Sequence, residues 1–440
     1  MLKRKFYDTL ANWKKSHQRE CLLVKGARQV GKTFIIDKFA SENYRSYLYI
    51  NFIANPECRQ IFEGSLEAND IFKKLSIRFQ AFRLLPSDTA IFLDEIQNCP
   101  EARTALKPLA IDGRADVIAS GSLLGLTYLN DGLSRERDEA SIPVGYERQM
   151  TMHSLDFEEY LWAVGYRPDV IDMLRESFTS VTPLPSASND RMRELFREYI
   201  AVGGMPDVVN RFLAENSFSA AFDAQQKIIA SNLDDIAKYA PTTDKPKIRA
   251  CYLSIPTQLA RENKKFKYSD VEHGGTARKF GMAVDWLRES ALCLQCHNLE
   301  TPMLPISVYR RPDCFKLYAS DIGTLTAMMG FDVKKAIIDD TLAGFAKGGI
   351  YENAIMSLLV RRGYSPAYYL PKSNMSEIDF FIEKDGGVVP IEVKARNDTT
   401  VSFNRTLERP DIAFGYKFVN GNLGRVGKKI TLPHYMAMFV

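Results

Sequence analysis

The sequence lacks long apolar runs, is poor in cysteine and carries little net charge. None of its 440 residues falls in a stretch approaching the roughly 18 to 20 apolar residues that a membrane helix needs. No apolar segment of signal-peptide length follows the basic start. The seven cysteines are scattered and odd in number, which is typical of reduced thiols. We therefore expect a cytoplasmic protein without a membrane partner.

Composition excludes little else. The net charge of +4 is too small to indicate nucleic-acid binding by itself. Hydrophobic residues make up 45% of the chain and charged residues 25%, which is ordinary for globular domains. A chain of this length is expected to contain about two to four domains. Function must therefore be read from motifs and from local charge.

A glycine-rich segment follows a short apolar run near the start. Residues 26–33 read Gly-Ala-Arg-Gln-Val-Gly-Lys-Thr and match the G-x-x-x-x-G-K-[ST] pattern at every fixed position. Residues 21–25 are predicted to form a strand and residues 34–40 a helix, which is the context this motif requires. Glycines let backbone N–H groups approach phosphates, and the helix N-terminus faces the same negative charge.

These residues predict a site for ATP and Mg²⁺. Lys32 is expected to reach the β and γ phosphates, and the Thr33 hydroxyl is expected to bind Mg²⁺. No Asn-Lys-x-Asp guanine signature occurs, which favours adenine. The predicted nucleotide-binding residues are Gly26, Ala27, Arg28, Gln29, Val30, Gly31, Lys32, Thr33 and Phe34.

Two further apolar runs end in polar residues. Within residues 90–97, the apolar run is followed by Asp94, which is predicted to hold Mg²⁺, and by Glu95, which is predicted to polarise the attacking water. Residues 116–122 end in Ser120 and Ser122, either of which could sense the γ phosphate, although Ser-Gly after a strand is also an ordinary turn. Because the runs alternate with helical stretches, we expect a parallel sheet flanked by helices.

Residues 155–235 are predicted to be mostly helical, with a loop near residues 182–188 and a tight turn at residues 203–206. Residues 241–280 then contain nine Lys or Arg against four Asp or Glu, a local surplus of five. Short helices followed by a strand-like piece suggest a winged helix, with Arg278 and Lys279 facing the phosphates of double-stranded DNA. A solvated helical face and a protein-interaction module are the alternatives.

Residues 293–297, Cys-Leu-Gln-Cys-His, match the haem-attachment string of c-type cytochromes. That attachment requires export, for which no signal is visible, and a zinc site would find only Cys314 nearby as a further ligand. We therefore interpret both cysteines as small hydrophobic residues.

Acidic residues and a lysine gather in the last part of the chain. Glu352 lies near the start of an amphipathic helix, and Asp379 begins a strand. After a Gly-Gly turn, Glu392 and Lys394 share one face of the next strand. We predict that Asp379 and Glu392 hold Mg²⁺, with Glu352 as an additional ligand, and that Lys394 orients the attacking water. The alternative is a strand pair with ordinary surface charges.

Together these motifs resemble prokaryotic AAA-type ATPases that join a P-loop domain to a helical lid, a winged helix and a restriction-endonuclease-like domain. The matching segments follow the expected order, namely residues 26–33, 92–97, 120–122, 143–145, 155–161, 203–206, 315–318, 351–353, 377–380 and 391–394. The resemblance implies a multidomain α/β fold that binds and hydrolyses ATP. The corresponding domains are residues 1–152 (ATPase), 153–240 (lid), 241–310 (winged helix) and 311–440 (nuclease-like).

One feature departs from this family. Many members carry Gly-Arg before the lid, whereas here Tyr146 follows Gly145. Arg135, Arg137 and Arg148 are the remaining candidates for an arginine that reaches a phosphate. This departure favours slow hydrolysis or a nucleotide switch.

Three functions remain open. The first is an ATPase whose nucleotide state repositions the basic and nuclease-like regions, with DNA as a partner. The second is an ATP-regulated, Mg²⁺-dependent DNA nuclease. The third is a nucleotide-switched scaffold for a protein partner. A homo-oligomer is compatible with each of them.

Overall fold

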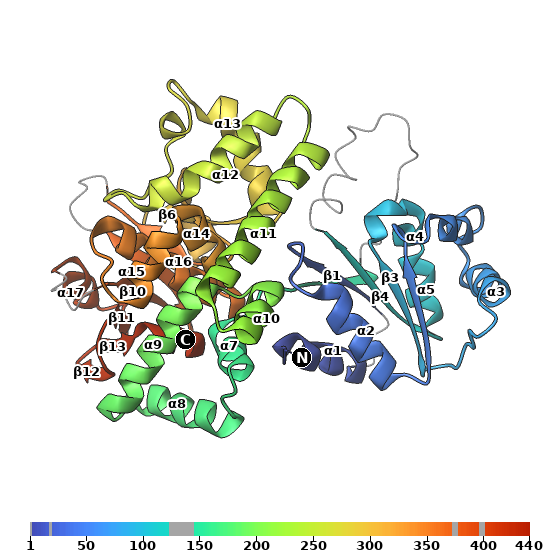
Figure 1. Ribbon diagram of the computed structural model, residues 1–440, viewed down its shortest axis with the longest axis horizontal. Helices are drawn as coiled ribbons and strands as arrows, with labels where there is room; N and C mark the ends of the chain where they lie inside the picture. The colour runs from blue at the N-terminus through green and yellow to red at the C-terminus, as the bar shows by residue number, and fades with distance from the viewer. Residues whose placement is uncertain (1, 17–19, 123–144, 372–376, 396–400) are drawn as a thin grey trace. The chain divides into compact units, whose positions relative to one another are not determined.

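The computed structural model describes residues 2–16, 20–122, 145–371, 377–395 and 401–440 (Figure 1). Two compact units are present. The N-terminal unit comprises Lys3–Ser154 with Glu289–Ala291, and the C-terminal unit comprises Leu155–Arg288 with Leu292–Val440. Within the described ranges, no helix is both long and apolar enough to cross a membrane.

The N-terminal unit contains a sheet of five parallel strands in the order β2-β3-β4-β1-β5. Its strands are β1 (Cys21–Gly26), β2 (Ser46–Asn51), β3 (Thr89–Asp94), β4 (Asp116–Ser122) and β5 (Glu147–Thr151). Every residue of β3 is buried, as expected for a parallel strand covered on both faces. The predicted parallel α/β sheet is therefore confirmed.

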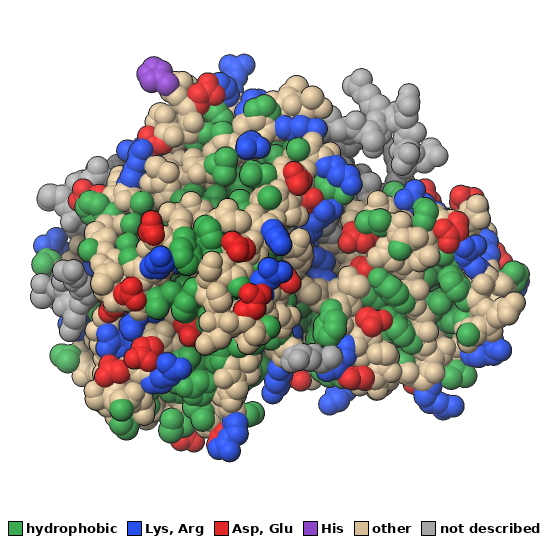
Figure 2. All heavy atoms as spheres, in the orientation of Figure 1, with side chains coloured by type: hydrophobic (Ala, Val, Ile, Leu, Met, Phe, Trp, Pro, Cys, Tyr) green, Lys and Arg blue, Asp and Glu red, His purple; other side chains and the backbone are tan. Residues whose placement is uncertain are grey.

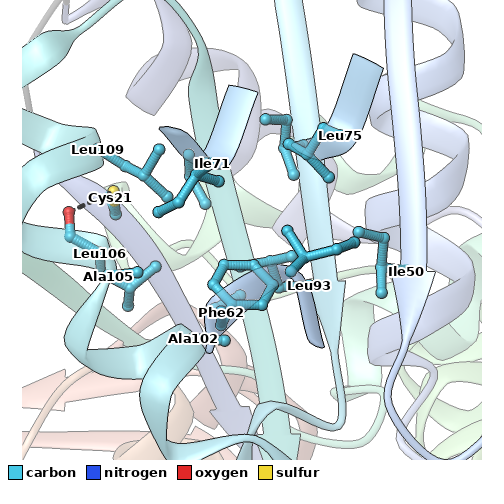
Figure 3. Packing of buried hydrophobic residues seen from close by; sticks show 14 of the residues in the cluster. Cys21, Ile50, Phe62, Ile71, Leu75, Leu93, Ala102, Ala105, Leu106 and Leu109 are labelled. Atoms are coloured by element: carbon cyan, nitrogen blue, oxygen red, sulfur yellow. Dashed lines mark hydrogen bonds between the residues drawn. The ribbon is translucent and has the colours of Figure 1, made fainter. Parts of the chain in front are cut away.

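Helices cover both faces of this sheet. Its helical segments are α1 (Lys5–Lys15), α2 (Lys32–Asn43), η1 (Pro56–Phe62), α3 (Ala68–Arg78), η2 (Ile96–Asn98), α4 (Pro100–Thr104) and α5 (Leu106–Asp112). On one face, alternate strand residues such as Leu23, Ile50 and Leu93 pack with the buried residues of η1, α3, α4 and α5 (Figure 3). Helix α2 packs on strands of the same sheet, and α1 packs on α2.

The C-terminal unit begins with helices, as the sequence predicts for residues 153–240. These are α7 (Phe157–Ala163), α8 (Pro168–Ser180), α9 (Ser186–Val202), α10 (Pro206–Glu215) and α11 (Phe218–Tyr239). Asp156 caps α7 in a reciprocal capping box with Glu159. The predicted tight turn lies between α9 and α10. A Cβ on Gly204 would lie 2.0 Å from the Leu155 carbonyl oxygen, so this turn requires glycine.

The rest of the unit surrounds an eight-stranded mixed sheet in the order β12-β13-β11-β10-β9-β8-β6-β7. The strands are β6 (Cys293–Leu299), β7 (Arg310–Ala319), β8 (Ala367–Tyr369), β9 (Ile378–Lys384), β10 (Gly387–Val393), β11 (Gly415–Val419), β12 (Gly424–Val426) and β13 (Lys429–Pro433). The remaining helical segments are α12 (Lys245–Leu259), η4 (Tyr268–Asp270), α13 (Ala277–Glu289), η5 (Ile306–Tyr309), α14 (Ile322–Met329), α15 (Phe331–Ile338), α16 (Gly344–Arg361), α17 (Val401–Leu407) and η6 (His434–Phe439).

The predicted hairpin of the C-terminal region is present. Strands β9 and β10 pair antiparallel, and the turn between them places Asp385 and Gly386 in the left-handed region. Strand β7 pairs with β6 in the same sheet, so the predicted boundary between residues 310 and 311 falls inside one layer. Cys293 and Cys296 are buried, unpaired thiols on β6.

Candidate functional site

The glycine-rich loop connects β1 to α2. A Cβ on Gly26 would lie 2.3 Å from the Met152 carbonyl oxygen, so no side chain fits at that position. Gly31 has φ 92° and is the N-cap of α2, and Gln29 is also left-handed with φ 62°. Val30 is buried, whereas Phe34 is 54% exposed at the start of α2. The predicted strand, loop and helix are thus all present.

The Lys32 side chain bends back over the loop. Its Nζ donates to the carbonyl oxygens of Gly26 (3.0 Å) and Ala27 (2.9 Å). Burial lowers the pKa of Lys32 to about 8, although the nearby carboxylates of Glu95 and Asp94 oppose the shift. A phosphate placed on the loop would give this ammonium an anionic partner that the loop carbonyls do not supply.

Asp94 is the centre of the site. The Thr33 hydroxyl donates to Asp94 Oδ2 at 3.0 Å, and Ser120 donates its hydroxyl hydrogen to Asp94 Oδ1. The Asp94 side chain also accepts from the backbone N–H of Glu95 at 3.1 Å. Three residues predicted from separate motifs are therefore in direct contact. A hydroxyl and a buried carboxylate side by side are the hard oxygen donors that Mg²⁺ prefers, so the residues present fit that ion.

The sequence reasoning missed two residues of this site. The Tyr49 hydroxyl and the Asn51 amide donate to Asp94 Oδ2 at 3.0 and 3.1 Å. Both lie on β2, in which Asn51 is the register partner of Asp94. Burial, together with the neighbouring Asp94 carboxylate, raises the pKa of Tyr49 to about 12, although the Asn51 hydrogen bond opposes this. In the sequence, these two polar residues lie two positions apart at the end of a strand, and this spacing could have indicated that they belong to the site.

Glu95 follows Asp94 in an unusual backbone conformation. Its φ of 55° and ψ of 43° are left-handed, which costs a non-glycine residue on the order of 1 kcal/mol or more. The Gln97 side chain donates to the Glu95 carboxylate, which fixes its direction. A strained, oriented carboxylate next to Asp94 is consistent with the predicted role in polarising water.

Of the three predicted arginines, only Arg148 belongs to the described residues. Arg135, Arg137 and residues 143–144 lie outside the described residues. Arg148 is an exposed residue of β5 paired with Leu22, four positions before Gly26 along β1. At about 3.3 Å per residue, it lies roughly 13 Å from the loop end of the sheet. Ser122 ends β4 beside Gly26.

The second predicted constellation lies on β9 and β10. Asp379 Oδ2 accepts the Val393 N–H at 2.8 Å, and Lys394 Nζ lies 2.7 Å from Glu392 Oε1. Glu392 Oε2 is buried and has no hydrogen-bond partner among the described residues. Burial, with the charges of Glu352 and Glu392, raises the pKa of Asp379 well above its usual range. Burial also raises the pKa of Glu392, although Lys394 opposes it. Asp379, Glu392 and Lys394 therefore form one coupled group.

Glu352 on α16 is held by cations. Lys264 Nζ lies 2.6 Å from Glu352 Oε1, and Lys316 Nζ lies 3.5 Å from Oε2, which also accepts the Tyr318 hydroxyl at 3.2 Å. Burial alone would raise the pKa of Glu352, but Lys264 and Lys316 outweigh it and lower the pKa to about 2. In the described part of the chain, no group of three or more His, Cys, Asp or Glu is placed to hold a metal ion.

Lys316 was also missed by the sequence reasoning. It lies on β7, is fully buried, and pairs with Glu377 Oε1 at 2.5 Å as well as with Glu352. The residue belongs to the segment 315–318, to which no role was assigned. The available signal was a single lysine within the otherwise apolar run of residues 314–319.

The basic region, residues 241–280, contains helix α12, the short helix η4 and the first turn of α13. Arg278 and Lys279 are exposed in the first turn of α13, and Lys279 pairs with Glu272. Figure 2 shows Lys and Arg side chains over this region, interspersed with acidic and apolar ones. Several of its cations are partnered, as in the pairs Arg261–Asp270 and Lys247–Asp244. The net surplus is therefore spread over a mixed surface.

Three family models match parts of the chain. Residues 18–161 match a model described as an AAA domain, which supports a P-loop ATPase domain in the N-terminal unit. Residues 193–335 match a domain of unknown function (DUF8612), and residues 347–426 match another (DUF4143). No curated protein matches the chain.

Solved structures were also compared. A Walker-type ATPase of Pyrococcus abyssi is 14% identical, with a TM-score of 0.43 over 75% of this chain and 96% of that one. PCH-2 of C. elegans is 13% identical, with a TM-score of 0.26 over 47% and 58% of the two chains. Drosophila ORC bound to DNA is 14% identical, with a TM-score of 0.26 over 76% and 84%.

Proposed function

We propose that the chain is an ATPase that binds ATP with Mg²⁺ through residues 26–34. The observation that carries the proposal is the contact of Thr33 with Asp94 at 3.0 Å beside the half-buried Lys32. The loop N–H groups and Lys32 would bind the phosphates, while Thr33 and Asp94 would hold the ion. When bound, Mg²⁺ supplies neutralisation of phosphate charge.

Hydrolysis requires a base and a group that responds to the γ phosphate. We assign Glu95 to the attacking water because its carboxylate follows Asp94 directly and is oriented by Gln97. We assign Ser120 as the group that senses the γ phosphate because its hydroxyl contacts Asp94. Loss of the γ phosphate would then be transmitted to Asp94 through one hydrogen bond.

The test is calorimetric titration with ATP and Mg²⁺. Lys32→Ala is expected to abolish detectable binding, whereas Lys38→Ala, a surface substitution on the same helix, should leave it unchanged. Glu95→Gln should keep binding and lose turnover. Unchanged ATP affinity in Lys32→Ala would refute the assignment of the loop.

We propose further that the nucleotide state is coupled to DNA binding through residues 241–310. The order of α12, η4, α13 and β6 supports a winged helix, and the exposed Arg278 lies in the first turn of α13. DNA binding that weakens with salt and with Arg278→Gln, together with DNA-stimulated ATP turnover, is the expected result. Salt-independent binding, or none, would favour the scaffold for a protein partner.

The last part of the chain has a second candidate function, DNA cleavage. The order α16, β8, β9, β10, α17, β11, with β9 and β10 antiparallel and β10 and β11 parallel, supports a restriction-endonuclease-like fold. The buried Oε2 of Glu392, which no described residue contacts by a hydrogen bond, favours Asp379 and Glu392 as the cation ligands, with Lys394 beside them. Glu352 is the weaker candidate because two lysines hold it. DNA cleavage that needs Mg²⁺ and is lost in Asp379→Asn would support this function. Cleavage that persists in Asp379→Asn would exclude Asp379 from the cleavage mechanism.

A further inference from the structure

Arg4 lies outside every motif discussed above, yet it reaches the phosphate loop. It precedes α1 and is 8% exposed. Its Nη1 donates to the Val30 carbonyl oxygen at 2.9 Å, and its Nη2 donates to the His153 carbonyl oxygen at 2.6 Å. One guanidinium therefore joins the loop to the segment that follows β5.

The Val30 bond acts on a peptide group that faces two ways. The carbonyl of Val30 and the N–H of Gly31 belong to the same planar unit, so fixing the carbonyl fixes the direction of the N–H. A charged donor on the carbonyl also polarises the unit, which strengthens its N–H as a donor. In a phosphate loop, backbone N–H groups are the atoms that meet the phosphate oxygens.

The His153 bond supports the other end of the loop. Met152 donates its N–H to the Lys25 carbonyl at 2.7 Å, and its own carbonyl lies against Gly26 where a Cβ would stand. By holding His153, Arg4 holds the segment against which the first glycine packs. Both ends of the loop are thus braced from one side chain.

The helix that follows Arg4 is held in place by contacts of its own. Helix α1 buries Leu10 and Trp13, and Tyr7 donates to Glu42 of α2 at 2.8 Å. Asn43 donates to the Tyr7 hydroxyl at 2.9 Å. Because α2 begins at Lys32, the backbone that carries Arg4 is attached to the helix that carries the phosphate-binding lysine.

We propose that Arg4 is a positioning residue of the phosphate loop: it presets the peptide between Val30 and Gly31 for phosphate binding. The proposal rests on the proposed nucleotide function of that loop. Arginine suits the role because its planar fork serves two carbonyls at once, which one ammonium group cannot do in the same geometry.

The experiment compares Arg4→Met, Arg4→Lys and wild type in calorimetric titration with ATP and with inorganic pyrophosphate, both with Mg²⁺. Loss of a charged hydrogen bond is expected to raise the Kd of Arg4→Met about 10- to 100-fold for both ligands, with a smaller rise for Arg4→Lys. Arg45→Met is the matched control, since Arg45 is exposed and its ion pair with Asp88 lies at the surface. It should bind as wild type does.

Hydrogen exchange of the peptide containing residues 26–33 distinguishes a local effect on the phosphate loop from a general loss of stability. Faster exchange confined to this peptide in nucleotide-free Arg4→Lys is expected. A wild-type Kd for both ligands in a folded Arg4→Met, or unchanged exchange of the loop in Arg4→Lys, would overturn the proposal. If Arg4→Met does not fold, the exchange measurement on Arg4→Lys decides. Unchanged ATP affinity in Lys32→Ala would instead refute the nucleotide function itself.

Discussion

Substitution of Lys316 by methionine should destabilise the C-terminal unit strongly. The lysine is fully buried, and its Nζ pairs with Glu352 and with Glu377. Methionine fills a similar volume but leaves both carboxylates without this ammonium. Removing one partner of a buried ion pair typically costs about 3–5 kcal/mol. Here the lower end, about 3 kcal/mol, is expected, because Glu352 keeps Lys264 and Tyr318, and the Glu377 side chain is 27% exposed.

Urea denaturation followed by circular dichroism measures this loss. The matched variant is Lys316→Met combined with Glu377→Gln, which removes a carboxylate that pairs with Lys316 along with the ammonium. It should recover about 1–2 kcal/mol relative to the single variant, because the groups are in direct contact and are not additive. A loss below about 1 kcal/mol in Lys316→Met, or no recovery in the double variant, would refute the view that these carboxylates depend on Lys316 for their charge balance.

Three further outcomes are expected. Asn51→Ala should lower ATP turnover about 10-fold, which is the lower end for the loss of a hydrogen bond to a charged group, because four other donors still reach Asp94. Steady-state kinetics measures this rate, and an unchanged rate would contradict the prediction. Burial lowers the pKa of Lys32 to about 8, so its ammonium loses a proton above that pH. The Kd for ATP should therefore be constant below about pH 8 and rise above it. Calorimetry from about pH 6.5 to about 9.5 tests this, and a constant Kd over the whole range would contradict it. Gly204→Ala should cost at least about 3 kcal/mol in urea denaturation because its Cβ would meet the Leu155 carbonyl at 2.0 Å, and wild-type stability would contradict it.

Local patterns predicted the phosphate loop and the strand that ends at Asp94. Each depends on residues within about ten positions, where glycine placement and apolar runs determine the backbone. The same holds for the hairpin of β9 and β10, whose turn residues lie between two alternating strands. The sequence could therefore indicate the elements and most of the groups that meet at Asp94.

The missed groups depend on distant contacts. Tyr49 and Asn51 reach Asp94 because β2 lies beside β3, a register that their own segment does not specify. Lys316 meets Glu352 and Glu377 from segments 36 and 61 positions away. Arg4 is 149 positions from His153. Single-sequence patterns specify faces of elements, but they do not specify which elements become neighbours.

The kinds of partners around each carboxylate separate the candidate cation sites. Every donor assigned to Asp94 is neutral: three hydroxyls, an amide side chain and a backbone N–H. These bonds orient the carboxylate without placing a positive charge in direct contact with it. Glu352 has the opposite surroundings, because two ammonium groups already compensate it. Asp379 and Glu392 lie between these cases, because Lys394 pairs with Glu392 and the charge of Lys316 also acts on Asp379. Affinity for Mg²⁺ should therefore decrease from Asp94, through the Asp379 and Glu392 pair, to Glu352.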